Sequence, residues 1–140
     1  MLESRTILKR HNLRFTKSRA AILDIFVHQE AALSERDIEE SIQANCDRVT
    51  IYRTLSSFLD HGLIHRVLDD SGAMKYAMCA PNCHEGHQHG HDHVHFKCTN
   101  CGNTTCLDQV PIPPVTLPQG YLLSEVNMLL QGNCPTCAAQ

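Results

Sequence analysis

Two pairs of cysteines constrain the fold of this chain more than any other feature. They are Cys98-Thr-Asn-Cys101 and Cys134-Pro-Thr-Cys137, with 32 residues between them. Each C-x-x-C turn presents two sulfurs, so two turns brought together supply the four thiolates of a closed tetrahedral zinc site. Because this interval is longer than in the usual zinc ribbon, a small folded element is expected between the turns. The sequence therefore predicts one structural zinc per chain, held by Cys98, Cys101, Cys134 and Cys137.

Two disulfides or a redox C-x-x-C motif are the alternative uses of these cysteines. Disulfides need an oxidising compartment, and the chain shows no signal-peptide pattern. A redox motif needs only one pair, usually at the start of a helix. With eight cysteines in the chain, we expect reduced thiols that act as metal ligands in a cytoplasmic protein. No apolar run approaches the ~18 residues of a membrane span, so no membrane partner is expected.

A second concentration of metal-binding side chains lies between residues 79 and 106. Its imidazoles and thiols belong to Cys79, Cys83, His84, His87, His89, His91, His93, His95 and Cys106. Mixed nitrogen and sulfur ligands favour zinc or another late transition metal over magnesium or calcium. Because four cysteines already satisfy one ion, these residues predict a second site, weaker and reversible, that could sense metal.

The net charge of −3 is unevenly distributed along the chain. Residues 1–19 carry six basic side chains against Glu3 alone, whereas residues 76–140 carry Lys97 alone against four acidic side chains. A basic front end on an acidic chain favours a polyanion-binding face, although short basic runs are also common on solvated surfaces. Aromatic residues make up 5% of the chain and Trp is absent, so metal cross-links are expected to compensate for a small apolar core.

The N-terminal half has the pattern of several short helices. A basic helix is expected over residues 3–12. Thr16, Ser34 and Asp47 each suit the N-cap of a following helix, because a short side-chain oxygen can accept an otherwise unpaired backbone N–H. Gly62 is expected to end the last of these helices in a left-handed conformation.

Two strands are predicted to follow the helices. Residues 63–68 and 74–78 flank Asp69-Asp70-Ser71-Gly72, which is a hairpin turn signal. Helices followed by a β-hairpin predict a winged helix-turn-helix domain, which we assign to residues 1–79. Residues 80–92 are polar and His-rich, and predict a linker loop that binds metal loosely.

The helix that begins after Asp47 leaves polar side chains on its outer face. Tyr52 and Arg53 lie one turn into it, where a phenol and a guanidinium can reach base edges and phosphates in a major groove. The alternative is a solvated face with a partly buried tyrosine. The basic segment at the front of the chain favours DNA. The predicted DNA contacts are Arg14, Thr16, Arg19, Thr50, Tyr52 and Arg53.

Residues 93–140 predict a small, mostly antiparallel β domain clamped by zinc, which makes the chain α+β overall. A strand over residues 93–98 leads into the first cysteine turn, and residues 103–107 are expected to pair with it. Prolines exclude a regular helix over residues 111–118. A last strand is expected within the apolar residues 121–130. Such a sheet has an exposed edge that a second copy of the chain would cover.

These segments together resemble the ferric uptake regulator superfamily of metal-dependent repressors over nearly the whole chain. The matching stretches are Arg14-Phe-Thr-Lys-Ser-Arg19, Thr50-Ile-Tyr-Arg53, His61-Gly-Leu-Ile64, His93-x-His95-x-x-Cys98-x-x-Cys101-Gly102 and Gly132-x-Cys134-x-x-Cys137. The resemblance implies a homodimer that binds a dyad-symmetric operator in double-stranded DNA when metal fills a site between its two domains. It implies no small-molecule substrate.

The departures from the family pattern concern the choice of metal. Iron- and peroxide-sensing members usually carry a histidine or an acidic residue at positions where this chain has Ala32, Ala77, Val94 and Val126. The stretch Tyr76-Ala-Met-Cys79 instead resembles the Y-x-x-C of zinc uptake regulators. Thiolate and imidazole ligands without a carboxylate shift the preference from iron(II) toward zinc.

The resemblance therefore implies one regulatory zinc per chain at His65, Cys79, His93 and His95, with Cys106 as a fifth candidate. A four-coordinate ion needs only four of them, and the sequence leaves open which one is not used. His65 alone would also fit a surface histidine of the wing, and Cys79 a packed strand thiol. An iron- or manganese-sensing repressor of the same superfamily is the alternative.

Two other classes of function fit these residues less well. Zinc deaminases combine H-x-E with a later P-C-x-x-C, but here Glu85 follows His84 directly and Asn133 precedes Cys134. A zinc closed by four thiolates also leaves no position for water, so no enzyme is expected. A zinc-storage or chaperone protein would suit the His-rich loop, but would leave the segment Arg14–Arg19 and the helix bearing Tyr52 without a role.

Overall fold

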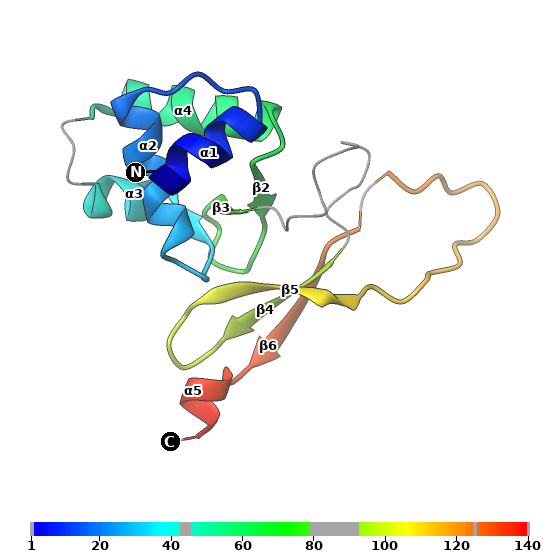
Figure 1. The fold of residues 1–140 in the computed structure, drawn as a ribbon. Helices are drawn as coiled ribbons and strands as arrows, with labels where there is room; N and C mark the ends of the chain where they lie inside the picture. Colours follow the sequence, from blue (N-terminus) through cyan, green and yellow to red (C-terminus); the bar gives the residue numbers. More distant parts are fainter. Residues whose placement is uncertain (1, 43–45, 79–92, 125, 140) are drawn as a thin grey trace.

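The computed structural model describes residues 2–42, 46–78, 93–124 and 126–139 (Figure 1). A helical body with its own small sheet comes first in the chain, and a second sheet follows. This arrangement confirms the α+β, winged-helix fold class that the sequence predicts. Within the described residues, no helix combines the length and the apolar character that crossing a membrane requires.

Four helices make up most of the first body. They are α1 (Leu2–Arg10), α2 (Lys17–Val27), α3 (Glu35–Ser41) and α4 (Arg48–Asp60). Their apolar faces converge on one core, in which the least exposed side chains are Leu8, Ile22, Leu23, Ile38, Ile51, Leu55, Phe58, Leu63 and Ile64. This packing leaves the outer face of α4 accessible to a partner.

The predicted helix caps are confirmed. Thr16, Ser34 and Asp47 each accept a backbone N–H from the residue three positions further on. Ser34 makes a complete capping box, since the carboxylate of Asp37 accepts the Ser34 N–H at 2.9 Å. Gly62 follows α4 with a φ of 71°, in the left-handed region that few other residues adopt. These local interactions fix where α2, α3 and α4 begin and where α4 ends.

The first sheet has the strand order β1-β3-β2 and is antiparallel. Its strands are β1 (Leu33–Ser34), β2 (Ile64–Val67) and β3 (Lys75–Met78). We call β2, β3 and the turn between them the wing. The wing follows α4 directly in the chain, so the helix expected to bind DNA and the wing belong to the same body.

The second sheet has the order β5-β4-β6 and is followed by a short helix. Its elements are β4 (His93–Cys98), β5 (Thr104–Pro111), β6 (Met128–Gly132) and α5 (Pro135–Ala138). Strands β4 and β5 are antiparallel, as expected, whereas β6 runs parallel to β4. The sequence predicts a mostly antiparallel sheet, and β6 is its parallel exception; β6 also begins at Met128, later than the strand expected over residues 121–130.

The parallel pairing has a simple geometric cause. β5 ends beside the start of β4, where Pro111 pairs with His93. The chain returns to the same end of the sheet, where Met128 pairs with Val94, and so β6 must run in the direction of β4. Neither helix nor strand forms among the described residues of the connection 112–127, in keeping with its prolines.

The two bodies meet along β5. The N–H of Ala32 donates to the carbonyl of Thr104 at 2.6 Å, which ties the segment before α3 to the second sheet. Beside this bond, Ala32, Val67 and Ala77 form a buried apolar patch against which Cys106 packs. The wing thus lies directly on the sheet that carries the two candidate metal sites.

Candidate functional site

The four cysteines of the two C-x-x-C turns lie together. Each sulfur is within 4.8 Å of the others in this group, which we call the cysteine cluster. Because β4 and β6 are paired in register, Cys98 at the end of β4 lies opposite Gly132 at the end of β6. The turn after each strand then carries the remaining thiols to the same point. The cluster belongs wholly to the second body.

The electrostatics of the cysteine cluster favour a bound cation. Backbone N–H groups of Cys101 and Cys134 lower the pKa of the Cys98 thiol to about 6. The pKa of Cys137 is raised to about 11, because the lowering effect of Asn100 is outweighed by the neighbouring sulfurs of Cys134 and Cys98. Four sulfurs this close repel one another once ionised, and a zinc ion with its preference for four thiolates fits the set.

A second group of potential ligands spans the two bodies. His65 lies on β2 of the wing, His95 on β4 and Cys106 on β5, and their ligand atoms lie within 4.8 Å of one another. His65 Nε2 is 3.3 Å from Cys106 Sγ, and the rings of His65 and His95 stack with centroids 6.1 Å apart. Both histidines are buried. We call this group the interdomain cluster.

The remaining predicted ligands are placed only in part. Cys79 and the His-rich segment 80–92 lie outside the described residues. For His93 the structure describes the backbone, as the first residue of β4. Cys106, the fifth candidate from the sequence, lies in the cluster beside His65. Two imidazoles and a thiol are a donor set that suits zinc, and an ion there would join the wing to the second sheet.

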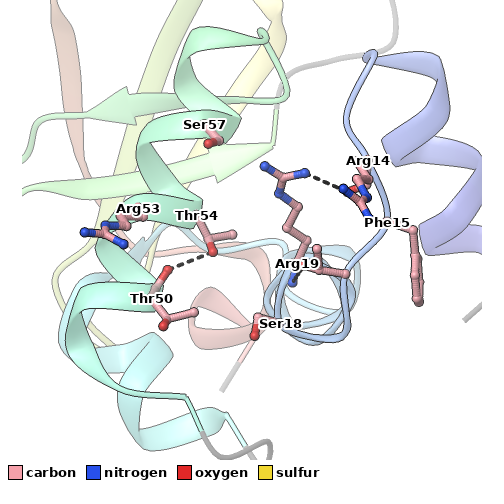
Figure 2. A pocket seen from close by; sticks show the side chains of 9 residues that line it. Arg14, Phe15, Ser18, Arg19, Thr50, Arg53, Thr54 and Ser57 are labelled. Carbon is pink, nitrogen blue, oxygen red and sulfur yellow. Dashed lines mark hydrogen bonds between the residues drawn. The ribbon is translucent and has the colours of Figure 1, made fainter.

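Five of the six residues predicted to contact DNA line one open hollow. It has a volume of about 520 Å³ and lies between α4 and the start of α2 (Figure 2). These five residues are Arg14, Thr16, Arg19, Thr50 and Arg53. Arg14, Arg19 and Arg53 give this part of the surface positive charge, which attracts phosphate. The sixth residue, Tyr52, projects from α4 and is 63% exposed.

Hydrogen bonds hold this surface in shape. Arg19 Nη1 donates to the carbonyl of Arg14 at 2.7 Å, and the Arg19 N–H donates to the hydroxyl of Thr16 at 3.1 Å. The guanidinium of Arg5 on α1 lies over the ring of Phe15, 3.9 Å from its centroid. The sequence carries no signal of the contact between Arg5 and Phe15, because only the tertiary packing of α1 brings them together.

A further set of contacts between the bodies was also missed. Asp69 and Asp70, which the sequence indicates only as part of a turn, hydrogen-bond to Thr104, Lys97 and Gln131 of the second sheet. Turn-forming residues give no sequence signal of a tertiary partner, since their turn role already accounts for them.

Comparison with known proteins points to one family. A family model described as "Ferric uptake regulator family" matches residues 10–116 of this chain. A ferric uptake regulation protein from Staphylococcus aureus is 32% identical over 135 residues, which cover 94% of this chain and 93% of the relative.

Solved structures share the fold. The Vibrio cholerae ferric uptake regulator matches with a TM-score of 0.57 and 20% identity, over 92% of this chain and 98% of the other. A zinc uptake regulator complexed with zinc and DNA matches with a TM-score of 0.62 and 22% identity, over 99% and 92%. Both regulators have the order of helical body and sheet body seen in Figure 1.

Proposed function

This chain belongs to the ferric uptake regulator family of metal-dependent transcriptional regulators, and we propose that it is a zinc-responsive repressor. In this proposal each chain holds one structural zinc in the cysteine cluster and one regulatory zinc in the interdomain cluster. A homodimer with both sites filled binds a dyad-symmetric operator. The observation that carries the proposal is the convergence of His65, His95 and Cys106 from two bodies onto one point.

The donor set supports zinc as the regulatory metal. A soft thiolate beside two imidazoles, with no carboxylate in the group, suits zinc better than iron(II) or manganese(II). Ala32 and Ala77 occupy positions where iron-sensing relatives usually carry ligands, and here both are buried against Val67. Either Cys79 or His93 would complete the four ligands.

The location of the cluster suggests how metal would control DNA binding. An ion shared by β2 and the second sheet holds the wing, and with it α4, at one orientation in each chain of the dimer. To move a regulator from mostly inactive to mostly active, the metal must favour the DNA-binding form by roughly 5 kcal/mol. The ion can favour the docked form because its full ligand set exists only when the two bodies are docked.

The basic hollow and α4 are the proposed DNA surface. Tyr52 and Arg53 would contact base edges in the major groove, while Arg14 and Arg19 would contact phosphates or the neighbouring minor groove. Thr16 and Thr50 line the same hollow and would add hydrogen bonds to the sugar-phosphate backbone of the DNA.

A second copy of the chain is the proposed partner of the second sheet. Strand β6 is an edge strand of that sheet, and such edges pair readily. Large apolar side chains are exposed on β6 and on the connection before it, at Val115, Tyr121, Leu122, Leu123 and Leu130. An interface with a second copy would remove these apolar side chains from water.

The test is operator binding at buffered free metal. DNA fragments from the promoters of metal-uptake genes would be titrated with protein in the presence of zinc, iron(II) or manganese(II). We expect zinc to activate binding at the lowest free concentration, and His65→Ala to abolish the response while leaving the dimer intact. Activation by iron(II) or manganese(II) at a lower free concentration than zinc would show that the zinc assignment is wrong. Zinc binding without any metal-dependent DNA binding would favour a storage protein.

A further inference from the structure

The face of the second sheet that carries the interdomain cluster has a second row of functional side chains. Across β5, β4 and β6, His95 pairs with Cys106, and two residues further along Lys97 pairs with both Thr104 and Gln131. Side chains two positions apart in a strand lie on the same face of a sheet. Thr104, Lys97 and Gln131 therefore form a polar row beside the candidate metal ligands, on the face that meets the wing.

The turn of the wing supplies the partners of this row. Asp69 follows His65 by four residues, and its side chain is 0% exposed. Its Oδ2 accepts the hydroxyl of Thr104 at 2.7 Å and lies 2.8 Å from Lys75 Nζ on the wing itself. The N–H of Ser71 donates to Oδ1 at 2.9 Å. A buried carboxylate with this many donors is fully satisfied only when the wing is docked.

The carboxylate of Asp69 is held in its charged form. Burial raises its pKa, but hydrogen bonds from Lys75, Ser71 and Thr104 together outweigh burial and leave the pKa well below the ordinary value of 3.8. The charge is therefore present throughout the physiological range, where the docked wing provides its partners.

Asp70 extends the contact to the other two strands. Its Oδ1 accepts a hydrogen bond from Lys97 Nζ on β4, and its Oδ2 accepts one from Gln131 Nε2 on β6 at 3.1 Å. The Asp70 side chain is 53% exposed, so this ion pair contributes less than the buried contacts of Asp69. Together the two acids reach all three strands of the sheet.

We propose that Asp69 and Asp70 form a latch, independent of metal, that docks the wing on the second sheet and so positions His65 toward His95 and Cys106. The role of the latch in metal binding rests on the proposed function, whereas docking itself does not. The latch residues are positioning residues, since they contact the other body and not the ion.

The latch matters because the ligands of the interdomain cluster come from two bodies. A metal binds the complete set only in molecules whose wing is docked, so its apparent affinity falls in proportion to the docked fraction. Loss of partners that orient metal ligands commonly weakens metal binding by roughly 10- to 100-fold. We expect an effect of that size when the latch is removed.

The first measurement follows docking directly. The Ala32 N–H bonds to the Thr104 carbonyl across the interface, so its hydrogen exchange in NMR spectra reports the docked state. The sample is full-length protein with zinc in the cysteine cluster and none in the interdomain cluster. Thr104→Val, which removes the hydroxyl but keeps the shape, should speed exchange of the Ala32 amide about tenfold or more. Thr104→Ser, which keeps the hydroxyl, should restore slow exchange.

The same spectra contain an internal control. The Leu63 N–H bonds to the Phe58 carbonyl within the first body, and its exchange should be unchanged in every variant that remains folded. Asp69→Asn should behave like Thr104→Val. Asp24→Asn, which alters an exposed carboxylate beside His28 on α2, is the matched control and should leave Ala32 exchange at the wild-type rate.

The second measurement is the affinity of the second zinc, by competition with a chelator. Asp69→Asn and Thr104→Val should each weaken the second zinc by roughly 10- to 100-fold and leave the first zinc unaffected. Wild-type zinc affinity and wild-type Ala32 exchange in both variants would overturn the latch. A wild-type protein that binds only one zinc would instead contradict the proposed function, and Ala32 exchange would still decide whether the latch docks the wing.

Discussion

The two candidate metal sites of this chain differ in their ligands and in their place in the fold. The cysteine cluster takes all four sulfurs from two turns at one end of a single sheet. The interdomain cluster combines His65 on the wing with His95 and Cys106 on that sheet. The cysteine cluster can form whenever the second body is folded, whereas the interdomain cluster also needs the two bodies to be docked.

This difference indicates what an ion at each site would contribute. Binding free energy at the cysteine cluster would be largely folding free energy of the second body, because the unfolded chain holds no preformed site. Binding free energy at the interdomain cluster would act on the orientation of two bodies that are already folded. The placement of the ligands in the fold would therefore separate a structural ion from a regulatory one.

The largest expected effect comes from breaking the cysteine cluster. Cys98→Ser should remove the first zinc, disorder the second body and abolish the dimer. Structural zinc contributes on the order of 10 kcal/mol to folding in small zinc domains. Zinc per chain and the mass of the assembly measure the outcome. Cys46→Ser is the matched control, since Cys46 belongs to neither cluster. A Cys98→Ser protein that is still a dimer with a normal zinc content would contradict the structural role of the cysteine cluster.

Breaking the interdomain cluster should have a narrower effect. His65→Ala should leave a folded dimer with one zinc per chain, because His65 makes no part of the cysteine cluster. It should lose the second zinc and the roughly 5 kcal/mol by which metal favours the DNA-binding form. Cys79→Ser should behave in the same way if Cys79 completes the ligand set. The measurement is zinc content beside operator affinity. Zinc-dependent operator binding by His65→Ala would show that the sensing residues are wrong.

The sequence predicted the parts of this molecule that depend on short stretches of chain. Thr16, Ser34 and Asp47 act as caps through bonds three residues long, and Gly62 adopts its conformation for local steric reasons. The cysteine turns were also visible, because their spacing is itself local. Because these signals are local and agree with one another, the helical body could be predicted from the sequence.

The contacts between distant segments were less accessible to sequence reasoning. The direction of β6 depends on where a connection of irregular structure returns to the sheet, which no periodicity encodes. Asp69 and Asp70 have the composition of an ordinary turn, and only the docked wing reveals Thr104 and Lys97 as their partners. The resemblance to a family supplied His65 as a candidate through its spacing from Cys79, whereas a lone histidine there would fit the surface of the wing.

Operator DNA should affect the two zinc ions unequally. Because coupling between sites is reciprocal, an operator that binds the docked form must tighten the second zinc by the same factor by which that zinc tightens DNA. The expected coupling is about 1–3 kcal/mol, and the first zinc should not change. Chelator competition with and without operator measures this coupling.

Tyr52→Ala should reduce operator affinity by about 1–3 kcal/mol and affinity for DNA of random sequence much less. Equal losses on both duplexes would argue against base contacts by Tyr52.

Lowering the pH from 7 to 5 should have the smallest effect, because the latch should keep the wing docked throughout this range. The pKa of Asp69 is lower in the folded protein than its ordinary value of 3.8. A carboxylate of this kind stabilises the docked state at every pH above that value, and the contribution is lost only as pH falls below it toward the folded pKa. The second zinc behaves differently, because its imidazole and thiol ligands must lose protons to bind and therefore release the ion as pH falls. In protein without zinc in the interdomain cluster, the protection factor of the Ala32 amide, which corrects exchange for its intrinsic pH dependence, should thus stay constant from pH 7 to pH 5. A protection factor that falls over this range would mean that Asp69 does not keep the wing docked.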